Sequence, residues 1–189
     1  MDGVEFLAAL AEIVGADNAA KYAAKFGDLD DIFMNEITNK EALAFFAYTT
    51  GLEWYQVINS QLWSGTASVA VKKFSEVLNS GLSHLPRYAA NEGIVYRGFQ
   101  TPDIAAFRAK YHPGAVVTFP GFTSATFHAP SAFGGNVFFT IRSLNARVIW
   151  YVAADYLEHE VLFPTNCRFR VSESFIREDR IAVELQELP

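Results

Sequence analysis

The chain has 189 residues, and its 15 basic and 21 acidic side chains give a formal net charge of −6 and a pI near 5.2. This balance excludes a broad basic face for nucleic acid, although it is compatible with a small local basic site. Because 51% of the residues are hydrophobic, the chain can bury a sizeable core. Its one cysteine, Cys167, excludes an intrachain disulfide framework and a multi-cysteine zinc site, and we expect the thiol to lie in the core.

The N-terminal sequence does not have the pattern of a signal peptide. Residues 1–5 are acidic where such a segment is basic, and Glu12 interrupts the apolar run that follows. No stretch reaches membrane-spanning length without a charge. We therefore expect the folded domain to work in a cytosol-like compartment, and a specialised system that secretes or delivers it into a target cell is compatible with this expectation.

The first half of the chain has the pattern of helices. Alanine-rich segments favour helices at residues 7–14 and 18–26, and Asn39 is expected to cap a helix that begins at Lys40. Two further apolar faces at helical spacing comprise Leu52, Tyr55, Ile58 and Leu62, and then Val71, Phe74 and Leu78. Gly81 is expected to end this series of helices.

After residue 92 the sequence changes to short β-rich runs. Thr101 as an N-cap and Pro102 at the first helical position predict one short helix that ends near Lys110. Strands are expected at residues 93–98, 115–119, 121–124, 137–142, 147–152, 159–163, 167–171 and 181–185. Helices first and strands afterwards predict an α+β fold in a single domain, with a helical part over 1–90 and a β-rich core over 91–189.

Several common active-site signatures are absent from the sequence. It contains no GxGxxG turn, no GxxxxGK[ST] loop, no HExxH motif and no GxSxG elbow. The four histidines are scattered, so a metal cluster is not expected. Dehydrogenases of the Rossmann type, P-loop enzymes, zinc metalloproteases and α/β-hydrolases are all disfavoured.

Glu158-His159-Glu160-Val161-Leu162-Phe163-Pro164 has the composition of a strand that ends at Pro164. Alternate side chains of a strand share a face, so Glu158 and Glu160 are expected to project together and His159 to the other side. Neighbouring carboxylates repel each other, which is unfavourable for stability alone. By itself such a pair more often marks a solvated edge strand, so its interpretation depends on partners elsewhere in the chain.

Two upstream stretches contain candidate partners. Arg97 ends a β-rich run and Gly98 follows it, so a guanidinium suited to phosphate stands beside backbone that a ligand can approach. Alone, such an arginine more often forms a structural salt bridge. In residues 121–126 the hydroxyls of Ser124 and Thr126 alternate, and both are expected to face one side of a strand.

In this order the three stretches resemble the motifs of the Arg–Ser–Glu class of mono-ADP-ribosyltransferases, which includes bacterial effector toxins, phage enzymes and vertebrate ecto-enzymes. The resemblance covers residues 96–164, and the helical first half is similar to the helical region that precedes these motifs in the family. It implies an ADP-ribosyltransferase-like fold, with a helical N-terminal half followed by a mixed, mainly antiparallel core of two β-sheets. It also implies NAD as a co-substrate and no metal.

The resemblance implies a role for each matched residue. Arg97 would hold the NAD phosphates, and the backbone of Gly98 would meet the nicotinamide amide. Ser124 would orient the catalytic Glu160, which would bond the nicotinamide ribose. Glu158 would engage the acceptor, and in the family a glutamate at this position accompanies transfer to arginine.

The chain departs from the family pattern at two places. Ala125 replaces the middle hydroxyl of the usual Ser-Thr-Ser and is expected to point away from the site, while Thr126 takes the last place and would contribute to the NAD site. Residues 128–136 would form the phosphate–nicotinamide loop, in which Phe133 would stack on the nicotinamide. This loop lacks the arginine usual in the family, and His128 or the glycine-rich backbone are candidates to replace it.

The resulting prediction is an NAD-dependent mono-ADP-ribosyltransferase, as an effector toxin or a phage enzyme, that modifies an arginine of a target protein and releases nicotinamide. An NAD glycohydrolase, transfer onto RNA, and a non-catalytic binding module remain open as alternatives. For a toxin the resemblance implies a cognate immunity protein as a further partner. A membrane partner is not expected, and the acidic composition counts against nucleic acid. Surface loops, residues 155–157 among them, are expected to choose the acceptor.

Overall fold

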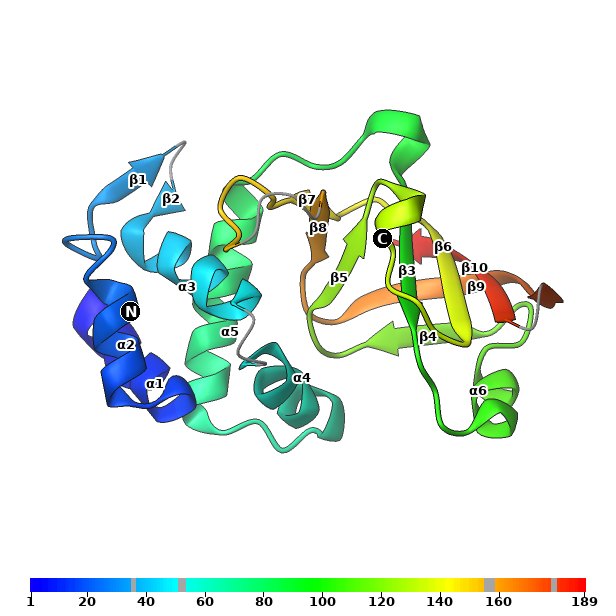
Figure 1. Cartoon of the computed structure of the whole chain (residues 1–189), viewed down its shortest axis with the longest axis horizontal. Coiled ribbons are helices and arrows are strands. Elements are labelled where there is room, and N and C mark those ends of the chain that lie inside the picture. The colour runs from blue at the N-terminus through cyan, green and yellow to red at the C-terminus, as the bar shows by residue number, and fades with distance from the viewer. Residues whose placement is uncertain (35–36, 51–53, 155–158, 178–179) are drawn as a thin grey trace. The chain divides into compact units, whose positions relative to one another are not determined.

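The computed structural model describes residues 1–34, 37–50, 54–154, 159–177 and 180–189. The chain forms two compact units, which are shown in Figure 1. The helical unit comprises Met1–Pro86 and Ile149–Tyr156, and the β unit comprises Arg87–Val148 and Leu157–Pro189. The helical unit therefore includes a segment that follows the first strands of the β unit in sequence.

The helical unit consists of five helices and a two-stranded ribbon within its described residues. Its helices are α1 (Gly3–Val14), α2 (Ala16–Ala23), α3 (Asn39–Thr49), α4 (Trp54–Ser64) and α5 (Val69–His84), and its ribbon pairs β1 (Ile32–Met34) with β2 (Ile37–Thr38). Apolar side chains at helical spacing fill its interior, including Phe6, Leu10, Phe45, Phe74 and Leu78, which are all fully buried. Within the described residues no helix is both long and apolar enough to cross a bilayer.

Two details of the expected helices are wrong. Thr38, and not Asn39, caps α3, because it forms a capping box with Glu41. The Asn39 side chain instead donates to the carbonyl of Asp28 at 2.7 Å. In α4, Ile58 is buried as expected but Tyr55 is exposed, whereas Leu52 lies outside the described residues.

Gly81 does not end a helix, since α5 continues to His84. The residue is buried, and a Cβ atom at this position would lie 2.8 Å from the ring of Phe45 in α3. The glycine therefore permits close packing of α5 against α3 and is not a stop signal.

The β unit is built on one hydrogen-bonded sheet of eight described strands in the order β4-β9-β10-β6-β3-β5-β8-β7. The strands are β3 (Ile94–Phe99), β4 (Val116–Phe119), β5 (Thr123–Thr126), β6 (Val137–Arg142), β7 (Arg147–Val148), β8 (Glu160–Phe163), β9 (Cys167–Arg177) and β10 (Arg180–Leu188). The β6–β10 pair is parallel and the other neighbours are antiparallel. The two sheets that we expected are thus joined, at a pairing of Tyr96 with Thr126.

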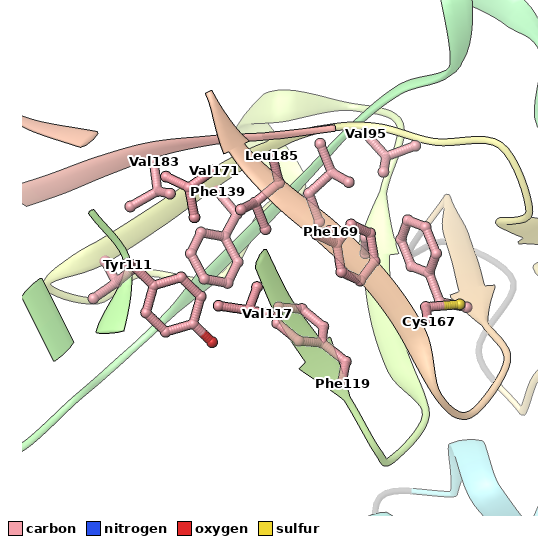
Figure 2. Packing of buried hydrophobic residues seen from close by; sticks show 14 of the residues in the cluster. Val95, Tyr111, Val117, Phe119, Phe139, Cys167, Phe169, Val171, Val183 and Leu185 are labelled. Atoms are coloured by element: carbon pink, nitrogen blue, oxygen red, sulfur yellow. The ribbon is translucent and has the colours of Figure 1, made fainter. Parts of the chain in front are cut away.

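The hydrophobic core of the β unit lies on one face of this sheet. Figure 2 shows rings of Phe119, Phe139 and Phe169 gathered there with aliphatic side chains of β9 and β10. Helix α6 (Ile104–Lys110) adds Phe107, which stacks on Tyr111 at 4.3 Å between ring centroids. Cys167 and Ala125 belong to the same buried cluster, so the expected core position of the thiol and the inward direction of Ala125 are both confirmed.

Three boundaries in the β unit differ from the expectation. Helix α6 is capped by Asp103, whose side chain accepts from the Ala106 N–H at 2.9 Å, because the backbone of Thr101 is bound by another side chain described below. The run at 147–152 forms a strand at Arg147–Val148 alone. Strand β8 begins at Glu160 and not before it, since His159 has a φ of 50°.

Candidate active site

The site forms where strands β3 and β5 separate. β3 pairs with β6 along its whole length, but with β5 at Tyr96 and Thr126 alone in the described ladder. Beyond that pair the two strands diverge, and the guanidinium of Arg97 spans the gap by donating from Nη1 to the carbonyl of Ser124 at 2.6 Å. The charged group also lies 6.0 Å from the ring centroid of Phe99. These contacts hold Arg97 at the mouth of the gap.

Three residues that pair across neighbouring strands place Glu160 beside the gap between β3 and β5. Thr126 stands opposite both Tyr96 and Glu160, so the three side chains share one face of the sheet. Their sequence neighbours Val95, Ala125 and Val161 point to the other face, into the hydrophobic core. The alternation of the three strands therefore places polar groups on one side and the core on the other.

A cavity of about 230 Å³ opens over Tyr96, Thr126 and Glu160. It is lined by Tyr96, Arg97, Gly98, Ser124, Ala125, Thr126, Ser131, Ala132, Phe133 and Glu160. Pockets that enclose a drug-sized ligand are usually larger, about 300–1,000 Å³, so this one has room for only part of an extended ligand. Glu160 is buried against it, with 8% of its surface exposed.

The hydroxyl of Thr126 connects the strand of Glu160 to the loop over the cavity. It accepts from the backbone N–H of His128 at 3.1 Å and lies 3.4 Å from the carbonyl oxygen of His159. The same carbonyl accepts from the N–H of Phe127 at 3.4 Å. His159 has a left-handed conformation that is uncommon for a residue with a side chain, and these two contacts hold the start of β8 in it.

The loop of residues 128–136 rests directly on strand β3. A Cβ atom at Gly98 would overlap the carbonyl oxygen of Phe133, and one at Gly135, with φ of 158°, would overlap the carbonyl of Phe99. Glycine is therefore required at both positions for this close approach of backbone to backbone. The Phe133 ring itself is 70% exposed at the rim of the cavity.

Asn136 fastens the far end of this loop. Its side-chain amide donates to the carbonyl of Thr101 and accepts from the Thr101 N–H, both at 2.8 Å. Its backbone N–H donates to Gln100 Oε1 at 3.2 Å, and its carbonyl accepts from the Ile181 N–H at 2.8 Å. At the near end, His128 Nδ1 and Ser131 Oγ are 2.9 Å apart. The loop is thus held at both ends by contacts within the chain itself.

The charges around the cavity suit a ligand with both signs. Arg97 offers a cation for phosphate, and Glu160 offers an anion next to a site where positive charge can develop. On the core side, burial raises the pKa of the Tyr111 phenol to about 12, and Arg97 opposes this shift. Burial also raises the pKa of the Cys167 thiol well above its ordinary value, so this thiol is protonated at neutral pH.

The structure brings together six of the seven residues that the sequence singled out. Arg97, Gly98, Ser124, Thr126, Phe133 and Glu160 all line the cavity. Glu158 lies outside the described residues, as do residues 155–157. Strand β8 begins at Glu160, and the expected sharing of a face by Glu158 and Glu160 stays a prediction.

Sequence reasoning missed Tyr96 as a lining residue, the contacts of the Thr126 hydroxyl, and Asn136. The sequence could have indicated Tyr96, since this residue lies two positions from Gly98 and shares its strand face. Nothing in the sequence pointed to Asn136, because its partner Thr101 is separated from it by 35 residues. Among the described residues no group of three or more His, Cys, Asp or Glu side chains is placed to hold a metal ion.

The family model for NAD:arginine ADP-ribosyltransferases matches residues 13–189. The chain therefore belongs to this family, and the resemblance of its motifs is confirmed. It is 36% identical over 137 residues to Mav of Mycobacterium avium (strain 104), named as an NAD(+)–arginine ADP-ribosyltransferase, with 70% of this chain and 16% of that protein covered.

It is also 29% identical over 154 residues to the NAD(+)–protein-arginine ADP-ribosyltransferase Tre1 of Serratia proteamaculans (strain 568), with 81% of this chain and 33% of that protein covered. The chain thus spans about a sixth and a third of the lengths of these two relatives.

The fold is also that of the ADP-ribosyltransferase HopU1 of Pseudomonas syringae pv. Tomato DC3000, whose crystal structure has a TM-score of 0.71 at 20% identity, covering 81% of this chain and 78% of that one. The crystal structure of the type III effector XopAI of Xanthomonas axonopodis pv. citri superposes with a TM-score of 0.77 at 20% identity, covering 97% of this chain and 86% of that one. The predicted α+β class with an ADP-ribosyltransferase-like fold is confirmed. Its helical half and its mainly antiparallel sheet follow the expected order along the chain.

Proposed function

We propose that this domain is an NAD-dependent mono-ADP-ribosyltransferase that transfers ADP-ribose to an arginine side chain of a target protein. The observation that carries the proposal is that Arg97, Ser124 and Glu160, from three different strands, line one cavity in a chain of this family. The names of both relatives include arginine as the acceptor. A site in which one of the three residues was missing would favour a non-catalytic module instead.

In the proposed reaction the bond between nicotinamide and its ribose breaks, and the electron pair leaves with the nicotinamide nitrogen. The ribose carbon gains oxocarbenium character, which the buried carboxylate of Glu160 would stabilise. Arg97 would hold the diphosphate, since its guanidinium is fixed against the Ser124 carbonyl. The hydroxyls of Ser124 and Thr126 face the same cavity, where Ser124 would orient Glu160.

The loop over the cavity would form the nicotinamide subsite. The backbone of Gly98, which is in close contact with the Phe133 carbonyl, would meet the amide of the nicotinamide, with the Phe133 ring stacking from the rim. Thr126 and Asn136 would keep this subsite in place from its two ends. His128 and the loop backbone remain the candidates for the phosphate contact that the missing arginine would make.

The acceptor guanidinium is protonated at pH 7 and must lose a proton as its nitrogen attacks the ribose carbon. We assign the acceptance of this proton to Glu158, on the strength of the family pattern. The domain would act as the catalytic part of an effector or toxin in a recipient cell. In the cell that produces it, a cognate immunity protein would block the cavity.

The proposal is tested by incubating the domain with NAD and agmatine, a small guanidine, and separating the products by mass spectrometry. ADP-ribosyl-agmatine together with free nicotinamide is the expected result. If the products are nicotinamide and free ADP-ribose, and no component of a cell lysate is modified either, the domain is an NAD glycohydrolase and the proposal is wrong. If nuclease treatment of a lysate removes the attached ADP-ribose, the domain modifies RNA instead of protein. If nothing reacts, the domain is a binding module.

A further inference from the structure

We propose that the acidic, apolar hairpin of the helical unit is a docking surface for a basic, amphipathic segment of the acceptor protein. We call this feature the hairpin surface, and it consists of Asp28, Asp31, Ile32, Phe33 and Met34. The inference rests on the proposed transferase function, since it names the kind of protein that presents the modified arginine.

The hairpin surface exposes three consecutive large apolar side chains. Ile32, Phe33 and Met34 form all of strand β1, and they are 65%, 44% and 36% exposed. The pairing of β1 with β2 is irregular between Ile32 and Met34, so their side chains do not simply alternate. Scattered exposed apolar residues are ordinary, but a contiguous group of this kind is typical of an interaction site.

The base of the hairpin is firmly fastened to the helical unit. The Asn39 N–H donates to the Asp31 carbonyl at 2.8 Å, and the Lys40 N–H donates to the Leu29 carbonyl at 2.9 Å. The ammonium of Lys40 binds the Asp30 carboxylate at 2.6 Å, and this contact lowers the pKa of Asp30. The exposure of β1 is therefore a property of an anchored element and not of a frayed end.

An aromatic series supports the hairpin from within the unit. The ring of Phe33 lies 5.9 Å from Phe26, which lies 6.0 Å from Phe46, which in turn meets Tyr22 at 5.5 Å between centroids. Figure 1 shows β1 and β2 beyond the ends of α2 and α3. A partner that covers the exposed side of Phe33 would thus extend an existing cluster of rings.

The charge of the helical unit determines which partner fits. Twelve of the 21 acidic residues and five of the 15 basic residues belong to this unit, which gives it a formal net charge of −7, whereas the β unit has +1. All nine arginines of the chain are in the β unit. Asp28 and Asp31 are exposed at the base of the hairpin, beside Ile32.

A partner segment that combines apolar side chains with lysine or arginine complements this surface in both respects. Charge attraction would raise its encounter rate, and burial of the three apolar side chains would slow its dissociation. An acidic partner would be repelled. A second copy of the chain would bring two units of −7 together, which disfavours self-association through this face.

The experiment compares two acceptors of the same enzyme. Agmatine reports the reaction alone, because it has no protein segment that a docking surface could bind, and a histone mixture serves as the basic protein probe. The variant Ile32→Ser/Met34→Ser spares Phe33 and its ring contacts. We expect kcat/KM for histone to fall roughly tenfold, as for loss of anchoring side chains, while kcat/KM for agmatine stays within twofold.

A matched control removes two other exposed apolar side chains from the same unit. Val4 and Val69 are 81% and 69% exposed, at the starts of α1 and α5. The variant Val4→Ser/Val69→Ser should leave both reactions unchanged. An equal loss of histone modification in the two double variants would overturn the assignment of docking to the hairpin.

A second pair of variants tests the charge. Asp28→Asn/Asp31→Asn should weaken the histone reaction and flatten its dependence on salt, since exposed charges are screened within about 10 Å at 0.1 M salt. Glu12→Gln/Glu76→Gln makes the same change of charge elsewhere on the unit and should have a smaller effect. If both pairs of variants weaken the histone reaction equally, the attraction comes from the overall charge of the unit, and the hairpin surface is not the docking site.

Binding of a fluorescent lysine- and arginine-rich peptide, followed by anisotropy without NAD, keeps the inference separate from the proposed function. If agmatine is not modified, the transferase proposal fails, but the peptide must still bind the wild type more tightly than Ile32→Ser/Met34→Ser. Equal peptide affinity would reject the hairpin surface whatever the activity. A dimer in sedimentation that this variant abolishes would replace the basic partner with a second copy.

Discussion

Two regions of the β unit each contain a buried carboxylate, and they use it differently. At one corner Glu187 is 2% exposed and accepts from the N–H groups of Leu144 and Asn145 at 2.6 and 2.9 Å, from Asn145 Nδ2 at 2.9 Å and from Ser143 Oγ at 3.3 Å. Glu160 is also buried, at 8% exposed, but it lines a cavity beside Arg97. Burial alone therefore does not separate a structural carboxylate from a candidate catalytic one, whereas access to a cavity does.

The two regions also fasten their loops in different ways. Glu187 binds the turn at residues 143–145 through its charged group, whereas Asn136 fastens the loop of residues 128–136 to the backbone of Thr101 through a neutral amide. A charged anchor beside the cavity would compete with Arg97 and Glu160 for a charged ligand. The neutral anchor holds the loop without adding to the field of the site.

The largest expected effect is the contrast between Glu160→Gln and Glu187→Gln in activity. Glu160→Gln should lower NAD cleavage about 100- to 1,000-fold, the usual loss when one electrostatic stabiliser of a transition state is removed. Glu187→Gln should retain activity at temperatures where it is folded. Nicotinamide release, measured beside the melting temperature of each variant, makes the comparison. Equal activity losses in two folded variants would contradict it.

The next effect concerns stability. Glu187→Ala should lower the free energy of unfolding by about 3 kcal/mol, because it leaves the backbone N–H groups of Leu144 and Asn145 without their acceptor. Urea denaturation measures this loss. Glu184→Ala, at an exposed position on the same strand, is the control and should change stability by less than about 0.5 kcal/mol. A similar cost at both positions would remove the structural role of Glu187.

Loss of the loop anchor should be smaller and should affect mainly the binding of NAD. Asn136→Leu removes both contacts with Thr101, and we expect KM for NAD to rise about tenfold with a smaller change in kcat, because the loop reaches its bound position less often. Gln100→Ala removes one weaker contact and should show a lesser effect. Unchanged KM in a folded Asn136→Leu variant would rule out a role of the anchor in NAD binding.

The last effect concerns Tyr111 in the core and appears only at high pH. The folded state raises the pKa of Tyr111 to about 12, whereas a tyrosine in an unfolded chain ionises near 10. Above pH 10 the unfolded chain therefore releases this proton first, so stability falls between about pH 10 and 12, by at most about 1.4 kcal/mol per pH unit. Urea unfolding of wild type and Tyr111→Phe over this range should show a steeper decline for the wild type, and parallel declines would contradict the assignment.

Most of the candidate site residues could be predicted from the sequence, because each lies in a short local motif. Arg97, Ser124 and Glu160 each stand in a short motif, and strand alternation correctly placed Ser124 and Thr126 toward one side and Ala125 toward the core. The family resemblance then predicted the fold. Helix α5 shows the limit, since the residue that looked like its end, Gly81, is a packing contact with Phe45.

What could not be predicted depends on contacts between distant residues. The predicted start of α6 was wrong because the backbone of Thr101 is hydrogen-bonded to the side chain of Asn136, 35 residues later in the chain. Glu187 binds a turn more than 40 residues before it. The start of β8 was wrong because His159 adopts a left-handed conformation that contacts with Thr126 and Phe127 support, and its neighbours in sequence have strand composition.

We infer that the cavity between β3, β5 and β8 binds the reactive end of NAD. A crystal structure of the domain with a non-cleavable NAD analogue tests it most directly. We expect the nicotinamide ring between the Phe133 loop and Glu160, with the diphosphate at the guanidinium of Arg97. An analogue that binds in solution but occupies another place in the crystal, with this cavity empty, would contradict the account.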